Sequence, residues 1–385
     1  MRERWLWFGA LVVAAVAVFA GVRWAWTENR LGGAASPPQT PAQVGVGVWP
    51  SEASAEPPGD DPQRFARSTF AQGLAQPTAM AFGRDGALYV TELVGRVTVL
   101  RDTDGDGRAD QASVFADGLT DPLGVAVLRP GEIVVSQRGR ITRLRDTNGD
   151  GAADERQDIV TGLPVGRHQN DNVVVGPDGR LYWGQGSRSD HGESGVVPYE
   201  ASILSANVDG SDLKVVATGL RNPYGLAFDA KTGALYATDN GRDVPDKGVP
   251  DELNLIEAGG DYGWPDCWGA GEGTHCEGTK LPLLLLPPHS SADGLAVYRG
   301  EAFPGEYQGA VFIALWGAND GDPNVGRQVV VALPPKEAGR PWTVAPFATG
   351  FIHPLAVAVG PDGALYVADM GRNEIVRFAP PAASR

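Results

Sequence analysis

The sequence predicts an all-β protein, a six-bladed β-propeller preceded by an N-terminal transmembrane or signal helix and a disordered linker. Three observations support this. The 385 residues include 52 Gly and 30 Pro, which is typical of a chain with many tight turns. A short motif recurs at a spacing of about 45 residues, the length of one four-stranded blade. A long apolar run occupies the N-terminus, and a change in composition follows it.

The apolar run comes first in the chain. It spans 18 residues, Trp5–Val22, and follows two arginines. This length is at the lower edge of what crosses a bilayer and is long for the core of a signal peptide. Small residues ending at Ala20 permit cleavage, whereas Trp24 and Trp26 are typical of an interfacial aromatic belt. Residues 1–26 are therefore expected to form an uncleaved signal anchor or, as the alternative, a cleaved signal peptide.

Either alternative places the rest of the chain outside the cytoplasm, in the periplasm or at the cell surface, with the membrane reached through the N-terminal segment. Residues 27–66 are rich in proline and lack apolar periodicity, so they are expected to form a semi-extended, disordered linker. The propeller is expected over residues 67–380.

Six related segments fill that range. Each contains an apolar run for an inner strand, and most continue through an Asp-Gly type turn into a second strand. A blade cannot bury both of its faces alone, so six units are expected to stack in a ring. An open β-solenoid is the alternative, but it suits shorter and more uniform periods. The segments are 73–90, 118–127, 162–183, 219–236, 293–315 and 350–367.

The net charge and the cysteine spacing argue against nucleic-acid binding and against a zinc site. A net charge of −15 argues against a nucleic-acid-binding groove, which needs clustered Lys and Arg. The two cysteines, Cys267 and Cys276, lie nine positions apart in a glycine-rich loop. A zinc site needs four ligands and only His275 is nearby, so a disulfide in an oxidising compartment is the preferred interpretation.

Two acidic loops, 102–110 and 146–154, repeat a pattern of oxygen-bearing side chains that imitates part of an EF-hand loop. The expected bidentate Glu at the twelfth position is missing from both. The loops therefore predict either structural calcium sites or metal-free turns. The candidate ligands are Asp102, Asp104, Asp106, Asp110, Asp146, Asn148, Asp150 and Asp154.

A second group of polar residues lies where loops enter the inner strands, at the mouth of the expected channel. His168 precedes the third inner strand and has the chemistry of a general base. Arg221 and Asn222 occupy the equivalent loop of the next blade, where a guanidinium suits a carboxylate or quinone oxygen. Carboxylates and backbone carbonyls in the following segment, 239–265, can hold a hard cation.

These motifs resemble the glucose/sorbosone dehydrogenase family, over roughly residues 66 to 380. The matching residues are His168, Arg221, Asn222 and the segments 239–241, 251–254 and 259–265. The resemblance implies oxidation of an aldose or related sugar at C1 with pyrroloquinoline quinone (PQQ) and calcium, hydride passing to the quinone. It implies His168 as base, Arg221 and Asn222 at the quinone, and calcium on the backbone carbonyls of Gly241 and Arg242. Electrons would leave to a periplasmic acceptor.

The chain departs from the family pattern at three places. Ser187 stands where the family has an Asp that orients the base, and Asp190 or Asp171 is the expected substitute. Trp316 stands where the family has a Lys. His353 and Leu355 replace the paired arginines that hold the PQQ carboxylates, and Arg327 and Arg372 are the cations expected to compensate.

Two other functions fit a six-bladed propeller. The last repeat is also similar to NHL repeats, which predicts a non-catalytic binding propeller. A calcium-dependent lactonase of the gluconolactonase type is the second alternative, and it requires carboxylate and Asn side chains that converge on the channel. The sequence predicts no oligomeric state.

Overall fold

The computed structural model describes residues 46–47, 49, 57–243, 248–318 and 325–381. The predicted signal segment, 1–26, lies outside these residues, as does most of the predicted linker. Among the residues described, no helix is long and apolar enough to span a membrane.

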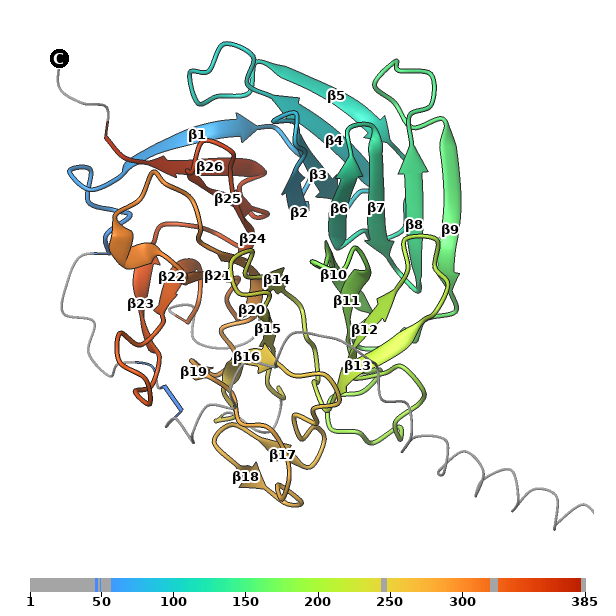
Figure 1. Cartoon of the computed structure of the whole chain (residues 1–385), viewed down its shortest axis with the longest axis vertical. Coiled ribbons are helices and arrows are strands. Elements are labelled where there is room, and N and C mark those ends of the chain that lie inside the picture. The colour runs from blue at the N-terminus through green and yellow to red at the C-terminus, as the bar shows by residue number, and fades with distance from the viewer. Residues whose placement is uncertain (1–45, 48, 50–56, 244–247, 319–324, 382–385) are drawn as a thin grey trace, which may run out of the picture. The chain divides into compact units, whose positions relative to one another are not determined.

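Within Val44–Arg385, six four-stranded antiparallel sheets stand around a common axis (Figure 1). This arrangement of the described residues confirms the all-β six-bladed propeller that the repeats predict. Blade 1 holds β2 (Pro77–Phe82), β3 (Leu88–Glu92), β4 (Arg96–Arg101) and β5 (Gln111–Ala116). Blade 2 holds β6 (Gly124–Arg129), β7 (Glu132–Gln137), β8 (Arg140–Arg145) and β9 (Glu155–Thr161).

Blade 3 holds β10 (Asn170–Val175), β11 (Leu181–Gln185), β12 (Ser202–Ala206) and β13 (Lys214–Thr218). Blade 4 holds β14 (Leu226–Phe228), β15 (Leu235–Asp239), β16 (Asp251–Ile256) and β19 (Leu284–Leu286), with the small hairpin β17 (Cys267–Trp268) and β18 (Glu272–Gly273) inserted before β19. Blade 5 holds β20 (Ala292–Val297), the 3₁₀ turn η1 (Gly305–Tyr307), β21 (Val311–Leu315), β22 (Gln328–Leu333) and β23 (Thr343–Ala348).

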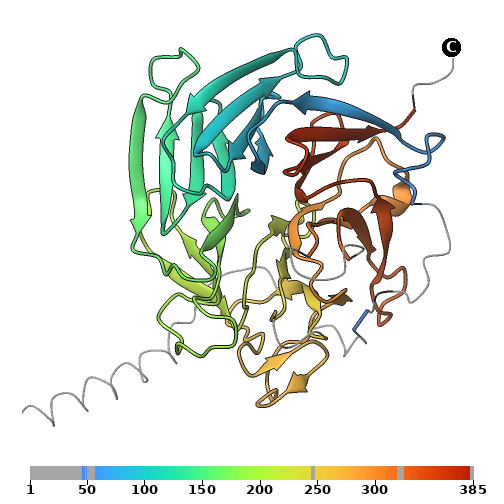
Figure 2. The same cartoon turned by 180° about the vertical axis from the view of Figure 1, so that it is seen from behind.

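Blade 6 is built from both ends of the propeller. It holds β24 (Pro354–Val359), β25 (Leu365–Asp369) and β26 (Glu374–Ala379), and its outer strand is β1 (Ala66–Gln72). β1 pairs antiparallel with β26 from Ala66 opposite Ala379 to Gln72 opposite Glu374, and Figure 2 shows the two strands side by side from behind. Hydrogen bonds between the first and last strands therefore close the ring.

The core is divided among the blade interfaces. Each of six buried apolar clusters lies between two neighbouring blades of the described chain. The cluster between blades 2 and 3 includes Trp183 and Ile141, both fully buried. This distribution is the physical reason for the ring, because both faces of a blade are apolar and each needs a neighbour.

Glycines on the inner strands let neighbouring strands approach closely. A Cβ on Gly225 would lie 2.2 Å from the carbonyl oxygen of Asp293, in the next blade. A Cβ on Gly294 would lie 2.5 Å from the carbonyl oxygen of Leu355. The axis of the propeller is therefore crowded by backbone, and only glycine fits at these contacts.

The structure differs from the predicted linker at its C-terminal end. Phe65 is only 1% exposed and lies in the aromatic cluster between blades 5 and 6, with its ring centroid 4.6 Å from that of Phe303. Gly59 donates a backbone hydrogen bond to Phe347, and Gly47 forms an isolated parallel bridge with Leu284, the first residue of β19. Proline content alone did not reveal that these residues pack against the blades.

Candidate active site

The mouth of the ring is the end at which the loops enter the inner strands. In antiparallel blades this end also carries the loops that join the second and third strands. A polar side chain at the end of the second strand holds the incoming loop in several blades. Asp239 accepts hydrogen bonds from the backbone N–H groups of Arg221 and Asn222, at 3.0 and 2.6 Å. Asp369 accepts two in the same way, from Ile352 and His353.

His168 lies in the loop that enters β10. Its backbone N–H donates to the carbonyl oxygen of Ser187 at 3.0 Å, which ties the loop to the end of β11. The ring nitrogen Nε2 is sealed from solvent and has no hydrogen-bond partner among the described residues. Burial and the nearby cations Arg221 and Arg167 lower the pKa of His168 to about 3, although Asp243 opposes this. The imidazole is therefore neutral at working pH with an unpartnered Nε2 atom, and the same lowering of its pKa makes it a weaker base than an ordinary histidine.

Gly186 separates His168 from Asn222. A Cβ at this glycine would lie 2.5 Å from the Cβ of His168 and 2.8 Å from Oδ1 of Asn222. Asn222 is 7% exposed, and its Oδ1 atom accepts no hydrogen bond from the part of the chain described. Two buried acceptors without donors therefore stand on either side of a glycine. Because buried polar groups normally have partners, this pair marks a place for a bound molecule.

Arg221 is the centre of a buried ionic network. Its Nε and one terminal nitrogen donate to Oδ1 of Asp190 at 2.9 and 2.5 Å, and the same terminal nitrogen donates to Asp243 at 2.9 Å. The other terminal nitrogen donates to the carbonyl oxygen of Asn240 at 3.0 Å. These bonds use four of the five N–H donors of a guanidinium, so one donor has no partner among the described residues and is available to a ligand.

The network extends to residues that no sequence motif marked. Arg167 also bonds Asp243, at 2.5 Å. Two histidines reach the same carboxylates, since Nδ1 of His191 lies 3.3 Å from Asp190 and Nδ1 of His289 lies 3.7 Å from Asp243. Burial would raise the pKa of Asp243, but Arg221 and Arg167 hold it below its usual range.

The predicted replacement for the base-orienting Asp is wrong. Asp190 is bound to Arg221, and among the described residues neither Asp190 nor Asp171 forms a hydrogen bond or ion pair with His168. Ser187 does not replace it either, because its hydroxyl donates to the carbonyl oxygen of Ser189.

The loop predicted to bind calcium follows β15, and a hydrogen bond to the first residue of β16 holds it in place. The N–H of Gly241 donates to Asp251 at 2.9 Å, while its carbonyl oxygen accepts no hydrogen bond from a described residue. The guanidinium of Arg242 lies 3.7 Å above the Trp268 ring. A pocket beside this loop is lined by Arg221, Asn240, Gly241, Arg242, Trp264 and Trp268.

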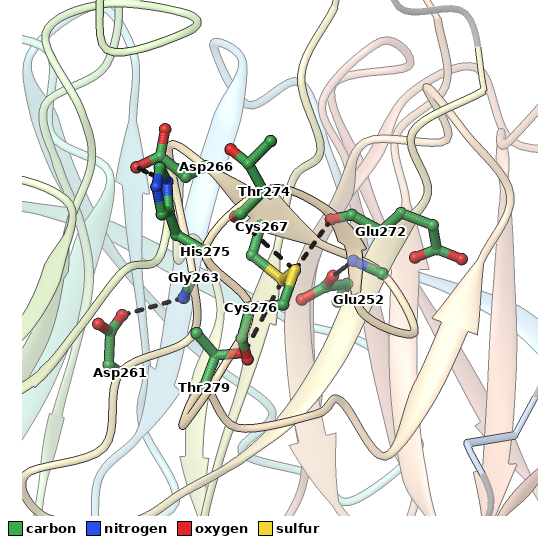
Figure 3. The surroundings of a disulfide bond; sticks show 11 residues. Glu252, Asp261, Gly263, Asp266, Cys267, Glu272, Thr274, His275, Cys276 and Thr279 are labelled. Carbon is green, nitrogen blue, oxygen red and sulfur yellow. Dashed lines mark hydrogen bonds and ion pairs between the residues drawn. A yellow bond between two sulfur atoms is a disulfide. The ribbon is translucent and has the colours of Figure 1, made fainter.

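The hairpin that carries Trp268 is crosslinked. Cys267 and Cys276 form a disulfide, which confirms the predicted pairing (Figure 3). The carboxylate of Glu252 accepts a hydrogen bond from the N–H of Gly269 at 2.7 Å and so holds the hairpin against β16. The disulfide therefore supports the aromatic side of the pocket.

The residues predicted to hold cofactor carboxylates lie in the loops that join the second and third strands of blades 5 and 6. Trp316 stacks on His353, with ring centroids 3.9 Å apart, so two departures from the family pattern contact each other. The Nε atom of Arg327 is buried and has no partner among the described residues. Arg372 is exposed and donates to the carbonyl oxygen of Gly350.

The two acidic loops lie on the outer parts of blades 1 and 2, away from the mouth. The oxygens of Asp102, Asp104 and Asp106 come within 4.8 Å of one another, the one such carboxylate group in the described residues. In each loop the first Asp accepts backbone N–H groups, Gly105 and Gly107 for Asp102. Calcium at either loop stays a prediction, since these bonds form the turn without metal.

Taken together, a six-bladed ring with His168, Arg221 and Asn222 gathered at its mouth resembles the propellers of the glucose/sorbosone dehydrogenase family. A family described as a domain of unknown function (DUF7133) matches residues 70–259. Individual relatives and solved structures define the resemblance more closely.

Quinoprotein glucose dehydrogenase B of Acinetobacter calcoaceticus is 30% identical over 144 residues, which cover 29% of each chain. Aldose sugar dehydrogenase YliI of Escherichia coli is 25% identical over 199 residues, 49% of each chain. An oxidoreductase (glucose dehydrogenase) from Thermus thermophilus is similar in structure, with 26% identity, a TM-score of 0.65, and coverage of 82% of this chain and 99% of the other. These proteins confirm the predicted resemblance. The chain spans about half the length, or less, of the curated relatives it matches.

Proposed function

We propose that the protein oxidises an aldose or related sugar at C1 with PQQ and calcium, His168 acting as the base. The observation that carries the proposal is the neutral imidazole of His168, whose Nε2 atom is buried and unpartnered beside the unpartnered Oδ1 of Asn222 in the described part of the chain. Relatives named as a quinoprotein glucose dehydrogenase and an aldose sugar dehydrogenase support the same reaction class.

The residues at the mouth fit most of this role. PQQ would supply the hydride acceptor. His168 would take the proton of the sugar C1 hydroxyl at Nε2, and Arg221 would contribute its remaining N–H donor from a position held by Asp190 and Asp243. Asn222 would hold the cofactor. The carbonyl oxygens of Gly241 and Arg242 would hold calcium, a hard cation that prefers oxygen ligands.

Recognition of the cofactor carboxylates rests on fewer residues. Arg327 is the strongest candidate, because its buried Nε lacks a partner among the described residues. Trp316, stacked on His353, would offer an aromatic face. Arg372 would contribute only if it gave up its bond to Gly350. We therefore expect weaker PQQ binding than a site with two dedicated arginines would give.

We further propose an extracytoplasmic location, with residues 1–26 as anchor or signal and a periplasmic acceptor for the electrons. The disulfide between Cys267 and Cys276 supports an oxidising compartment.

Titration of the purified protein with PQQ and calcium tests the proposal. Calorimetry is expected to detect PQQ binding that requires calcium, and the loaded protein is expected to reduce a dye when an aldose is added. Absence of PQQ binding with and without calcium would remove the dehydrogenase proposal. Lactone hydrolysis without PQQ would favour the lactonase, and ligand binding without any turnover would favour an NHL-like binding propeller.

The proposed base makes the pH profile diagnostic. Because the pKa of His168 is lowered to about 3, the imidazole stays neutral throughout the range in which an ordinary histidine, with a pKa of about 6.5, becomes protonated. A plot of kcat/KM against pH is expected to lack an acid-side break near about pH 6.5. The same lowered pKa affects folding. Below about pH 6.5 the unfolded state binds a proton at His168 that the folded state does not bind. The contribution of His168 to the free energy of unfolding is therefore complete above about pH 6.5 and is lost as pH falls toward 3. A break close to 6.5 would contradict a buried base.

Gly186→Ala tests the space between base and amide. The added methyl group lies too close to both His168 and Asn222, so one of them must move. A displacement of about 1 Å at such a site costs roughly 100-fold in kcat. Gly305→Ala is the matched control, because a Cβ there meets no atom within 4 Å. Equal turnover by the two variants would show that this spacing is unimportant.

A further inference from the structure

Two buried carboxylates lie at the axis of the ring, on either side of blade 4. Asp171 belongs to β10 in blade 3 and is 2% exposed, and Asp293 belongs to β20 in blade 5 and is 4% exposed. Blade 4 contributes Tyr224 and Asn240 between them. Asn240 donates from its amide to Oδ1 of Asp293 at 3.0 Å, and the backbone N–H of Asn172, the residue after Asp171, donates to the carbonyl oxygen of Tyr224 at 3.2 Å.

These side chains have no cationic partner among the described residues, and three of the four carry an oxygen without a donor. Asp293 is the exception, because its two oxygens accept from the amide of Asn240 and, at 3.1 Å, from the hydroxyl of Ser291. Oδ2 of Asp171, the hydroxyl of Tyr224 and Oδ1 of Asn240 are all buried without a hydrogen-bond partner in the described chain. Among the described residues, neither Asp171 nor Asp293 forms an ion pair, although many exposed carboxylates of the chain do. Both lie on inner strands rather than in turns, so loop geometry does not account for their position.

The electrostatic environment makes the lack of a counter-charge costly. Burial, followed by repulsion from Asp293 and Asp239, raises the pKa of Asp171 well above its usual range. Burial, with a smaller contribution from Asp251, raises the pKa of Asp293 to about 8, although hydrogen bonds oppose this. Burial and the carboxylates Asp293 and Asp171 also raise the pKa of Tyr224. Two buried acids without a counter-charge must either keep their protons or share a cation.

The oxygen atoms favour the cation. Two carboxylates, a phenol oxygen and an amide oxygen are the hard ligands that calcium prefers, and the two negative charges match a divalent ion. The side-chain amide of Asn240 donates through Nδ2 to Asp293. Its Oδ1 atom, which has no partner among the described residues, belongs to the same amide and therefore lies close to Asp293. Nitrogen and sulfur ligands, which would favour a transition metal, are missing from this group of four residues.

We propose that the axis of the propeller holds a divalent calcium ion, bound by Asp171, Asp293, Tyr224 and Asn240. This site is separate from the calcium proposed on the carbonyls of Gly241 and Arg242, because it uses side chains of three blades and needs no PQQ. An ion here would tie blades 3, 4 and 5 together. The inference does not rest on the proposed function, and carboxylate and Asn ligands at the axis are also the arrangement that the lactonase alternative requires.

Calcium binding to EDTA-treated protein, without PQQ or sugar, tests the site. Calorimetry with CaCl₂ alone is expected to detect a binding event that Asp171→Asn and Asp293→Asn each weaken by roughly 100-fold or more, since even outer-sphere partners of metal ligands contribute about 10–100-fold. Asp104→Asn, in the outer loop of blade 1, is the matched control and is expected to leave this event unchanged.

Thermal melting provides a second readout that does not require turnover. Calcium is expected to raise the Tm of the wild-type protein and of Asp104→Asn, but not of Asp171→Asn/Asp293→Asn. In EDTA at about pH 8 the double variant is expected to melt at or above the wild-type Tm, because two buried acids become neutral amides. An equal calcium response of the wild type and the double variant would overturn the proposal.

Crystals of the wild-type protein soaked in CaCl₂ keep the test decisive if the variants fail to fold. An anomalous peak between Asp171 and Asp293 is expected, and its absence at saturating calcium would refute the site. Failure of PQQ binding would leave this result unaffected, so the two proposals are separable.

Discussion

Replacing His168 by alanine is expected to lower dye-linked aldose oxidation by roughly 10²–10⁴-fold, the usual contribution of a positioned general base. The expectation rests on the neutral imidazole and on its unpartnered Nε2 atom at the mouth of the ring. Because the buried Nε2 atom of His168 bonds no described residue, its removal is expected to leave the fold and the Tm nearly unchanged.

The matched control is His275→Gln. His275 is exposed and pairs with Asp266 at the surface of the disulfide hairpin. This variant is expected to retain full turnover. Calorimetric titration with PQQ and calcium is expected to give similar affinity in both variants, so that the loss in His168→Ala falls on kcat. A His168→Ala enzyme with turnover close to wild type would exclude His168 as the base.

Arg221→Met is expected to lower the free energy of unfolding by about 3–5 kcal/mol, the usual cost of removing one partner from a buried ion pair. The Arg221 side chain is 3% exposed, and its loss leaves Asp190, only 11% exposed at its side chain, without its main cation. Turnover is expected to fall as well, since the network beside His168 loses its centre. Urea denaturation followed by tryptophan fluorescence measures the first effect.

Arg372→Met is the control for Arg221→Met. Both residues are arginines predicted to contact the cofactor, but Arg372 is 47% exposed and pairs with Asp369 at 3.4 Å. The buried Asp369 carboxylate also accepts hydrogen bonds from the backbone N–H groups of Ile352, His353 and Gly371, so loss of the half-exposed Arg372 guanidinium is expected to change stability much less. Equal stabilities of the two variants would contradict the central role of the Arg221 network. Restoration of stability by Asp190→Asn in the Arg221→Met background would support it.

Much of the fold could be read from local patterns. The inner strands and the turns after them repeat because each blade needs the same apolar strand and the same tight turn. The outer strand of blade 6 was different, since residues 66–72 carry none of the repeated motif. Their pairing with β26 joins residues about 300 positions apart, and nothing in either segment alone specifies the partner.

Some residues of the candidate site could likewise be predicted from the sequence, and others could not. His168, Arg221 and Asn222 stood out because they occupy equivalent loops before inner strands. Gly186 carries no motif, and its role appeared only when its neighbours in space were known. The bond between Arg167 and Asp243 spans 76 positions in the chain, so no local signal announces it.

By itself, the sequence determined the class of fold, the number of blades and the disulfide, because periodicity, turn residues and paired cysteines act over short stretches of chain. Only the tertiary structure decided how the ring closes, which carboxylates hold Arg221, and that Asp190 does not orient His168. It also decided that Asp171 and Asp293 are buried at the axis without a counter-charge among the described residues. Burial and pairing are properties of neighbours in space, and stacking six blades around one axis brings together residues that the chain keeps far apart.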